Sequence, residues 1–259
     1  MFIESSSSLT IAPKRIISLV PSQTALLHSL GLDEEVIGIT KFCIHPREWF
    51  DNKTRIGGTK ALNIDKIIEL QPDLIIANKE ENVKDQVEML AEKFPVWMTD
   101  VNNLDDAIQM ITDIGSLTHK NNEADKINSR IFESFSSIKN TEKQIPAAYL
   151  IWKNPYMTIG GDTFIHDMMD KAGFSNVFGQ KKRYPEISIE QLRESGCKMI
   201  LLSSEPYPFK EKHIEELEAE LPDVKAVIAD GEMFSWYGSH LLSSPGYFSE
   251  LYQKCVQAL

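Results

Sequence analysis

The sequence has few cysteines, no long apolar run and a shortage of basic residues. Its three cysteines, Cys43, Cys197 and Cys255, cannot all pair within one chain, and none lies in a C-x-x-C spacing typical of zinc ribbons. No segment is apolar for long enough to span a bilayer. With 38 acidic against 27 basic residues, the net charge of -11 disfavours binding to nucleic acid or to anionic lipid.

Sequence signatures of catalysis are also missing. The chain contains no G-x-S-x-G elbow, no H-E-x-x-H pair and no phosphate-binding loop of the form G-x-x-x-x-G-K-[ST]. The glycine pair before Asp162 and Thr163 is followed by no lysine, so it predicts a tight turn into a helix capped by Asp162. We therefore expect a binding protein rather than an enzyme, with no cofactor required.

Strands and helices alternate along the chain. Residues 15–20 form a short apolar run that Pro21 ends, and Ser22 is placed to cap a helix over residues 23–30. Further on, a helix over residues 83–94 leads into a strand over residues 95–99. This alternation is typical of βαβ units around a mainly parallel sheet.

One part of this pattern occurs twice. Residues 63–78 contain a cap, a short amphipathic helix, a turn and an apolar strand, and residues 188–203 contain the same features in the same order. A second helix and strand ending in aspartate follow each copy, over residues 87–100 and 214–230. Two matches in the same order indicate a duplicated lobe.

A continuous helical pattern without glycine or proline runs from about residue 121 to 139. Such a helix is a stiff connection. We therefore predict two Rossmann-like α/β lobes joined by a single long rigid helix, with a ligand cleft between the lobes. The expected segments are a disordered lead-in over 1–13, lobes over 14–118 and 145–259, and the interlobe helix over 119–144.

Three segments carry a resemblance to a known family. They are the R-I-I-S-L-V-P-S-Q-T run at 15–24, the I-G-G at 56–58, and the helix and strand with L-Q-P-D-L-I-I-A at 64–77. Together they resemble the class III periplasmic binding proteins, which serve ABC importers of vitamin B12, haem and ferric siderophores. The resemblance covers the chain from about residue 14 to its end.

The resemblance implies a substrate-binding protein that takes a metal chelate into the cleft and delivers it to a membrane permease with its ATPase. The chelate would be a ferric siderophore, haem or a corrinoid such as cobalamin. The family implies the periplasm or cell envelope, although no signal peptide is visible, and the alternative is a cytoplasmic protein. We expect a monomer with only a modest change of shape on binding.

Ligand contacts are expected just past the ends of predicted strands. The resemblance places Trp236 in the cleft, and Asn78 stands where the vitamin B12-binding members carry a tryptophan. Aromatic and cationic side chains suit a flat macrocycle or an anionic ferric chelate. The predicted ligand-binding residues are Ser22, Asn78, Lys79, Tyr156, Arg183, Tyr184, Trp236, Tyr237 and His240.

Two further groups of residues complete the predicted site. Cys43 and His45 offer a thiolate and an imidazole to a metal, although their spacing fits no local metal motif. Family members also carry one surface carboxylate per lobe that meets the permease. The predicted docking carboxylates here are Glu80, Glu81 and Asp85 in the first lobe and Glu232 in the second.

Two other functions remain open from the sequence. One is a cytoplasmic enzyme of similar two-lobed build, such as a chelatase that inserts metal into a tetrapyrrole. The other is a cytosolic chelate-binding sensor that kept the fold and lost transport. The long bridging helix and the lack of a histidine–glutamate metal-insertion pair disfavour the chelatase.

Overall fold

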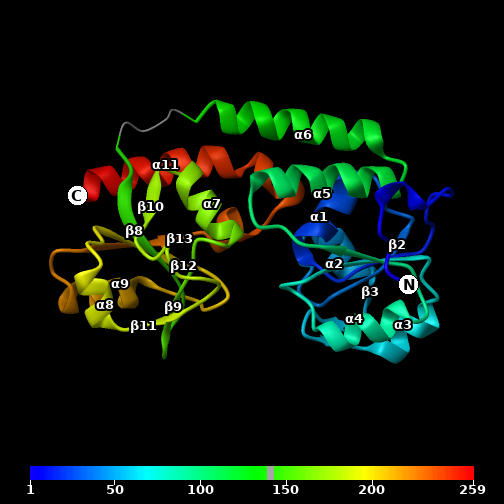
Figure 1. Cartoon of the computed structure of the whole chain (residues 1–259), viewed down its shortest axis with the longest axis horizontal. Helices are drawn as coiled ribbons and strands as arrows, with labels where there is room; N and C mark the ends of the chain where they lie inside the picture. Colours follow the sequence, from blue (N-terminus) through cyan, green and yellow to red (C-terminus); the bar gives the residue numbers. More distant parts are fainter. Residues whose placement is uncertain (139–142) are drawn as a thin grey trace. The chain divides into compact units, whose positions relative to one another are not determined.

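The computed structural model of the chain describes residues 1–138 and 143–259 (Figure 1). The chain divides into two compact units, which confirms the predicted α/β fold with two lobes. Unit 1 comprises Met1–Val101, Asp105–Arg130 and Tyr237–His240. Unit 2 comprises Asn102–Leu104, Ile131–Trp236 and Leu241–Leu259.

Unit 1 is built on a parallel sheet whose strands are almost entirely apolar. The strand order is β3-β2-β1-β6-β7, and every neighbouring pair is parallel. Ile75 and Ile76 in β6 are completely buried, as expected for strands covered on both faces. The strands are β1 (Ile16–Ser18), β2 (Val36–Ile39), β3 (Thr54–Arg55), β6 (Leu74–Asn78) and β7 (Val96–Thr99), beside a small hairpin of β4 (Gly57–Gly58) and β5 (Ala61–Leu62).

Helices cover both faces of this sheet. In Figure 1, α3 and α4 lie on the side of the unit 1 sheet away from α5. From β1 the chain adds β2 and β3 on one side, and it later returns to add β6 and β7 on the other side of β1. Because the crossovers between parallel strands are right-handed, this reversal places helices on both faces of the sheet. The helices are α1 (Pro21–Ser29), α2 (Arg47–Asn52), α3 (Ile64–Leu70), α4 (Lys84–Ala91), α5 (Leu104–Leu117) and α6 (Asn121–Ser136).

The first residues differ from the predicted disordered lead-in. The amide of Val96 donates to the carbonyl of Met1, and the amide of Ile3 donates to the carbonyl of Val96. A short 3-10 helix follows at Ser6–Ser8. The free edge of β7 offers unpaired backbone groups that these residues satisfy, which residue-by-residue hydrophobicity does not reveal.

Two predicted helix caps also differ. Ser22 lies inside α1, which begins at Pro21 because proline fits the first helical position, and Val20 is the N-cap without a side-chain hydrogen bond. Thr163, not Asp162, caps α7 (Phe164–Lys171), since its side chain accepts from the amide of His166. Each cap lies one or two residues from its predicted place.

Unit 2 contains a mixed sheet of order β11-β9-β8-β12-β13. Strand β8 (Ile145–Trp152) is long enough to pair with β10 (Phe174–Asn176) at its start and with β9 (Tyr156–Thr158) at its end. The strands β8, β12 (Met199–Ser203) and β13 (Lys225–Ala229) are parallel, whereas β9 and β11 (Glu186–Ile187) add antiparallel edges.

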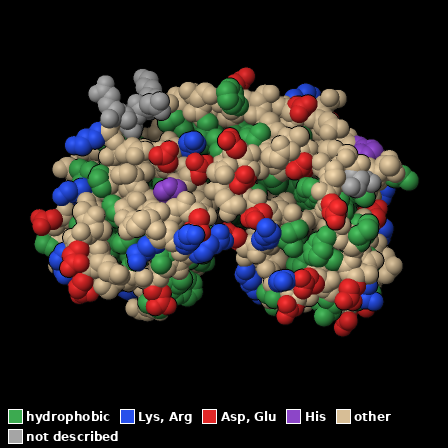
Figure 2. All heavy atoms as spheres, in the orientation of Figure 1, with side chains coloured by type: hydrophobic (Ala, Val, Ile, Leu, Met, Phe, Trp, Pro, Cys, Tyr) green, Lys and Arg blue, Asp and Glu red, His purple; other side chains and the backbone are tan. Residues whose placement is uncertain are grey.

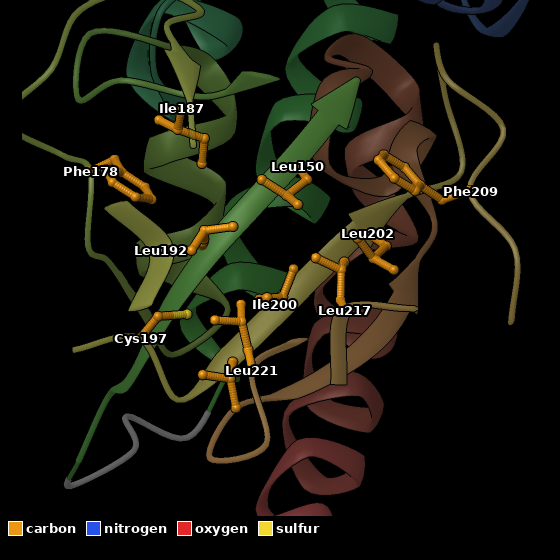
Figure 3. Packing of buried hydrophobic residues seen from close by; sticks show 12 residues of the cluster. Leu150, Phe178, Ile187, Leu192, Cys197, Ile200, Leu202, Phe209, Leu217 and Leu221 are labelled. Atoms are coloured by element: carbon orange, nitrogen blue, oxygen red, sulfur yellow. The ribbon is translucent and has the colours of Figure 1, made fainter. Parts of the chain in front are cut away.

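The core of unit 2 packs against β8 and β12. Leu150, Ile200 and Leu202 project from these strands toward Leu217 and Phe209 (Figure 3). Cys197 and Cys255 are also buried, which confirms their predicted core positions. The remaining helices are α8 (Ile189–Glu194), α9 (Glu211–Glu220), α10 (Gly231–Ser235), the 3-10 helix η2 (Gly238–Leu242) and α11 (Ser244–Ala258).

The predicted duplication is confirmed. The side chain of Asn63 accepts from the amide of Lys66 to cap α3, and Ser188 caps α8 through a reciprocal pair with Gln191. Each helix leads into the strand at the fourth place of its sheet order, β6 or β12. The same sequence pattern therefore builds the same helix–strand pair in both units.

The predicted interlobe helix corresponds to α6, Asn121–Ser136. Residue 139, its predicted last residue, lies outside the described residues. The division into units falls inside α6, between Arg130 and Ile131, and short segments at 102–104 and 237–240 also change unit. No helix among residues 1–138 and 143–259 is long and apolar enough to cross a membrane.

Candidate functional site

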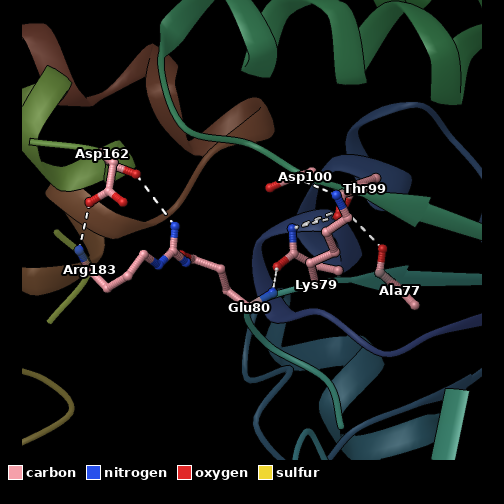
Figure 4. Close-up of polar contacts among 8 residues, drawn as sticks. Ala77, Lys79, Glu80, Thr99, Asp100, Asp162 and Arg183 are labelled. Carbon is pink, nitrogen blue, oxygen red and sulfur yellow. Dashed lines mark hydrogen bonds and ion pairs between the residues drawn. The ribbon is translucent and has the colours of Figure 1, made fainter. Parts of the chain in front are cut away.

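A buried network of amide and hydroxyl groups ties together the carboxyl ends of the unit 1 strands (Figure 4). The Nδ2 of Asn78 donates to the carbonyl and the Oγ1 of Thr99, at 3.3 and 3.1 Å. The Nε2 of Gln23 donates to the same Oγ1 at 2.6 Å. Because Asn78 is 2% exposed and Gln23 is fully buried, these hydrogen bonds are made without competition from water.

Asn78 also shapes the loop that follows β6. Its Oδ1 accepts from the amides of Glu80 and Glu81, at 2.8 and 3.2 Å. The amide of Asn78 donates to the Oδ1 of Asn82 at 2.9 Å, and Asn82 in turn donates to the carbonyls of Leu19 and Thr59. The side chain predicted to contact a ligand therefore makes its hydrogen bonds inside unit 1 and orders this loop.

The loop and the start of α4 carry the three predicted docking carboxylates of unit 1. Glu80 and Glu81 are half-buried, and Asp85 is exposed in the first turn of α4. The exposed ammonium of Lys79 pairs with Asp100 at 2.6 Å. Lys79, predicted as a ligand contact, is therefore held in a surface ion pair beside these acids.

A short segment after α10 carries three other predicted ligand residues, Trp236, Tyr237 and His240. Gly238 has a φ of 85°, and a Cβ there would lie 3.2 Å from the Cβ of Leu26 and 3.4 Å from the carbonyl of Ser22. Glycine is needed at this close approach to α1. The segment places Tyr237 and His240 in unit 1, the unit of Ser22, whereas Trp236 belongs to unit 2.

The two residues of the predicted metal pair lie in different surroundings. Cys43 is fully buried, with its sulfur 3.1 Å from the hydroxyls of both Thr24 and Thr40, whereas His45 is exposed. Burial raises the pKa of the Cys43 thiol above its ordinary value, which keeps it protonated and a poor ligand. Within residues 1–138 and 143–259, no group of three histidine, cysteine or acidic side chains could hold a metal ion.

Phe42 was not predicted, yet it is well placed for a ligand. It follows β2 at the carboxyl end of the sheet and is 50% exposed. The ammonium of Lys41 lies 5.1 Å from the centre of its ring. An exposed large apolar side chain at the carboxyl ends of parallel strands is typical of a binding surface.

Trp236 is buried in unit 2 against a carboxylate. Its Nε1 donates to the Oε1 of Glu205 at 3.2 Å, and the hydroxyl of Ser235 donates to the same oxygen at 3.0 Å. Burial raises the pKa of Glu205, although these two hydrogen bonds oppose the shift. Only 7% of Trp236 is exposed, so most of its indole supports the loop after β12.

The predicted docking residue of unit 2 lies in the next helix. Glu232 is in the first turn of α10, and its amide donates to the Oδ1 of Asp230 at 3.1 Å. It is half-buried, in contrast to the exposed Asp85 of unit 1. Its docking role stays a prediction.

An aromatic cluster lies at the carboxyl ends of β8 and β12. The ring of Tyr207 is 5.6 Å from Trp152, 4.7 Å from Phe209 and 5.6 Å from the buried His213. Trp152 is 40% exposed at the end of β8. Beside the cluster, burial raises the pKa of Tyr156, whose phenol therefore stays neutral and able to donate a hydrogen bond.

Arg183 and Tyr184 lie together at the β11 edge of unit 2. The amide of Arg183 donates to the Oδ1 of Asp162 at 2.6 Å, and its Nη1 donates to the carbonyl of Asp162 at 3.5 Å (Figure 4). Its guanidinium lies 5.7 Å from the centre of the Tyr184 ring. A cation held over an aromatic ring is a favourable contact for an anionic ligand to use.

The predicted ligand residues are thus divided between three places in unit 2 and two in unit 1. Figure 2 shows acidic and basic side chains interspersed over the visible face of each unit, so the negative net charge forms no single patch there. The sequence missed Phe42 and Trp152, which could have been found as large apolar residues at the ends of predicted strands.

The comparisons with known proteins agree with the resemblance. The family model described as periplasmic binding protein matches residues 16–231. A vitamin B12-binding protein of Vibrio parahaemolyticus is 26% identical over 194 residues, which cover 72% of this chain and 70% of the relative. An uncharacterised ABC transporter substrate-binding lipoprotein of Bacillus subtilis is 25% identical over 191 residues, which cover 70% of this chain and 60% of the relative.

A solved structure has the same fold. The periplasmic haem-binding protein of Roseiflexus sp. RS-1 in its apo form superposes with a TM-score of 0.77 at 16% sequence identity. The alignment covers 95% of this chain and 98% of that chain. At this identity the likeness concerns the fold alone.

Proposed function

The chain belongs to the family of periplasmic binding proteins, and we propose that it is the substrate-binding component of an ABC importer for a metal chelate. The relatives described above are named as binding proteins and not as enzymes, in agreement with the absence of catalytic signatures from the sequence. The chelatase alternative is therefore set aside. The proposed cargo is a corrinoid, haem or a ferric siderophore, carried as a substrate and not as a resident cofactor.

The observation that carries the proposal is the pairing of aromatic rings with cations in both units, where the ring is exposed in unit 1 and half-buried in unit 2. In unit 1, Phe42 is 50% exposed beside Lys41. In unit 2, Arg183 lies over Tyr184, and Lys153 forms an ion pair with Glu216 beside Tyr156. Flat macrocycles stack on aromatic faces, and anionic chelates accept charge-assisted hydrogen bonds from such cations.

The second half of the proposal is delivery to a permease. The relative from Bacillus subtilis is named as an ABC transporter substrate-binding lipoprotein, and the resemblance implies a carboxylate on each lobe that docks to the permease. In unit 1 the turn with Glu80 and Glu81 and the first turn of α4 with Asp85 supply three. We propose that these acids, with Glu232 in unit 2, contact the permease at the cell envelope.

The test is a visible absorption spectrum recorded after mixing and desalting. The probes are cyanocobalamin, haemin and a ferric siderophore, and retention of one of their bands is the expected result. Phe42→Ala should weaken binding of the retained chelate by about tenfold, because stacking on an aromatic ring is worth on the order of 1 kcal/mol. Retention of none of them, with no quenching of tryptophan fluorescence, would contradict the proposal.

A matched control is available on α6. Phe132 is 73% exposed, and it lies at no strand end. Phe132→Ala removes an exposed ring of the same type and should leave chelate affinity unchanged. An equal loss of affinity in both variants would mean that the chelate binds exposed apolar surface without a specific site.

A further inference from the structure

The two sheets end in equivalent outer strands, β7 in unit 1 and β13 in unit 2. Ile75 and Ile200 hold the same position in the duplicated helix–strand segments. In the sheets, Ile75 pairs with Val96 and Ile200 pairs with Ala226. Val96 and Ala226 are therefore equivalent residues on the two outer strands, and their surroundings can be compared directly.

In unit 1 the outer side of β7 is occupied by residues 1–3. The amide of Val96 donates to the carbonyl of Met1 at 2.9 Å, and the carbonyl of Val96 accepts from the amide of Ile3 at 2.9 Å. The ammonium group of Met1 donates to the carbonyl of Phe94 at 2.8 Å. Ile3 is 8% exposed, so the added segment also buries an apolar side chain. A short extended apolar segment thus satisfies the outer backbone groups of β7.

In unit 2 no strand of the described residues pairs with the outer side of β13, which is the last strand of its sheet order. The amide of Lys225 donates to the carbonyl of Lys198, next to β12, at 3.0 Å. Because successive residues of a strand direct their backbone groups to opposite sides, those of Ala226 and Ile228 point away from β12. Outward N–H and C=O groups of this kind are a template for a further strand.

A largely apolar hollow lies beside β13. Its volume is about 220 Å³, and its lining comes from α9, β13, α11 and the start of β12. Its apolar residues include Ile214, Val227, Cys255 and Ala258, and one glutamate and one lysine also line it. An apolar side chain of an added segment can therefore pack here, as Ile3 packs in unit 1.

One contact closes this outer side of β13. The Oε1 of Glu218, in α9, accepts from the amide of Ala226 at 3.0 Å. The Oε2 of Glu218 lies 3.7 Å from the ammonium of Lys225, which helps to orient the carboxylate. Its Oε1 thus accepts from Ala226 as the carbonyl of Met1 accepts from Val96 in unit 1. A segment can add at Ala226 only when Glu218 moves away.

We infer that the outer side of β13 is a strand-addition site for residues 1–3 of a second copy of this chain, and that Glu218 keeps it closed. The second copy is the occupant because it carries the segment that already fits the equivalent strand of unit 1. With Glu218 in place, each copy keeps residues 1–3 on its own β7 and the chain stays a monomer. The inference concerns self-association and does not depend on the proposed cargo.

The experiment is sedimentation velocity of the whole chain over a range of concentrations. Glu218→Ala removes the competing acceptor and should strengthen self-association at least about tenfold, the size expected for one hydrogen bond to a charged group. Glu218→Gln keeps an oxygen that accepts from Ala226, and it should stay a monomer like the parent. Glu215→Ala is the matched control, because Glu215 is an exposed acid of the same helix, and it should also stay a monomer.

A peptide with the sequence M-F-I-E-S-S, identical to residues 1–6, identifies the surface that associates. It should compete with the second copy and return Glu218→Ala to the monomer, whereas the same peptide with Ile3→Asp should not, because the hollow is largely apolar. Aggregates of a destabilised chain would not be released by the peptide. A monomeric Glu218→Ala, equal association of Glu218→Ala with the parent or with Glu218→Gln, or association that the peptide leaves unchanged would overturn the inference.

Discussion

The strands β6 in unit 1 and β12 in unit 2 occupy equivalent places in their sheets. The side chains at their carboxyl ends, however, make different contacts with the loops that follow. Asn78 ends β6, and its amide makes four hydrogen bonds, to Thr99 and to the amides of the next loop. Ser203 ends β12, and its hydroxyl only accepts from Tyr149 at 3.1 Å and donates to the carbonyl of Glu205 at 2.5 Å.

The loop after β12 relies more on apolar contacts, beside the hydrogen bonds that Glu205 accepts from Ser235 and Trp236. Tyr207 and Phe209 pack on each other and on His213, and Phe209 is 5% exposed. A duplicated helix–strand pair thus fixes where a loop begins, and the residues after the strand decide whether hydrogen bonds or aromatic packing hold it. The loop of unit 1 should depend on polar groups, and the loop of unit 2 on buried area.

The largest effect is expected for Phe209→Ala. Removing a buried ring from the core of unit 2 should reduce stability by about 3 kcal/mol, through lost burial and the cavity that remains. Hydrogen exchange followed by mass spectrometry should show faster exchange in β12 and α9 and no change in β1 and β6. Equal loss of protection in both units would contradict the expectation that aromatic packing stabilises the loop of unit 2 alone.

Asn78→Leu should come next. It leaves the amides of Glu80 and Glu81 without their acceptor and should reduce stability by about 2 kcal/mol, the usual penalty for buried groups left unpaired. The exchange of these two amides should accelerate most. Asn52→Leu, at the exposed end of α2, is the control and should have no such effect. Unchanged exchange at Glu80 and Glu81 would show that the amide does not order this loop.

Glu205→Gln should produce a smaller effect that depends on pH. Burial raises the pKa of Glu205 in the folded protein, so the folded state holds this proton more tightly than the unfolded chain. Its contribution to stability is complete below the ordinary glutamate pKa and is lost as pH rises through the folded-state pKa. Glutamine still accepts from Ser235 and Trp236 without the charge. The variant should therefore gain stability relative to the parent at pH 7 but not at pH 4, as measured by urea denaturation.

Lys79→Ala should have the smallest effect. The pair between Lys79 and Asp100 is well exposed, with 63% and 42% of the two side chains accessible. Exposed pairs contribute little, so the urea midpoint should change by less than the equivalent of about 0.5 kcal/mol. A loss as large as that of Asn78→Leu would mean that the loop of unit 1 is held by charge and not by the amide network.

Local sequence signals located most elements but not the contacts of their polar side chains. The short helix predicted within residues 63–78 forms over residues 64–70, because Asn63 is a local cap and the apolar spacing is regular. Asn78 shows the limit, since a polar residue just past a predicted strand has the same local signature whether it faces a ligand or its own loop. Its partner Thr99 is distant in sequence, and only packing brings the two together.

The sequence by itself determined the α/β class, the duplicated helix–strand pairs and the family, because these depend on periodicity, caps and short motifs within a few residues of each other. Tertiary structure alone decided that Cys43 is buried beside two threonines, that Tyr237 and Trp236 belong to different units, and that residues 1–3 pair with β7. Each of these depends on which side chains, distant in the sequence, pack against one another. The hydrophobic pattern of a sequence shows which face of an element is buried, but it does not specify those partners.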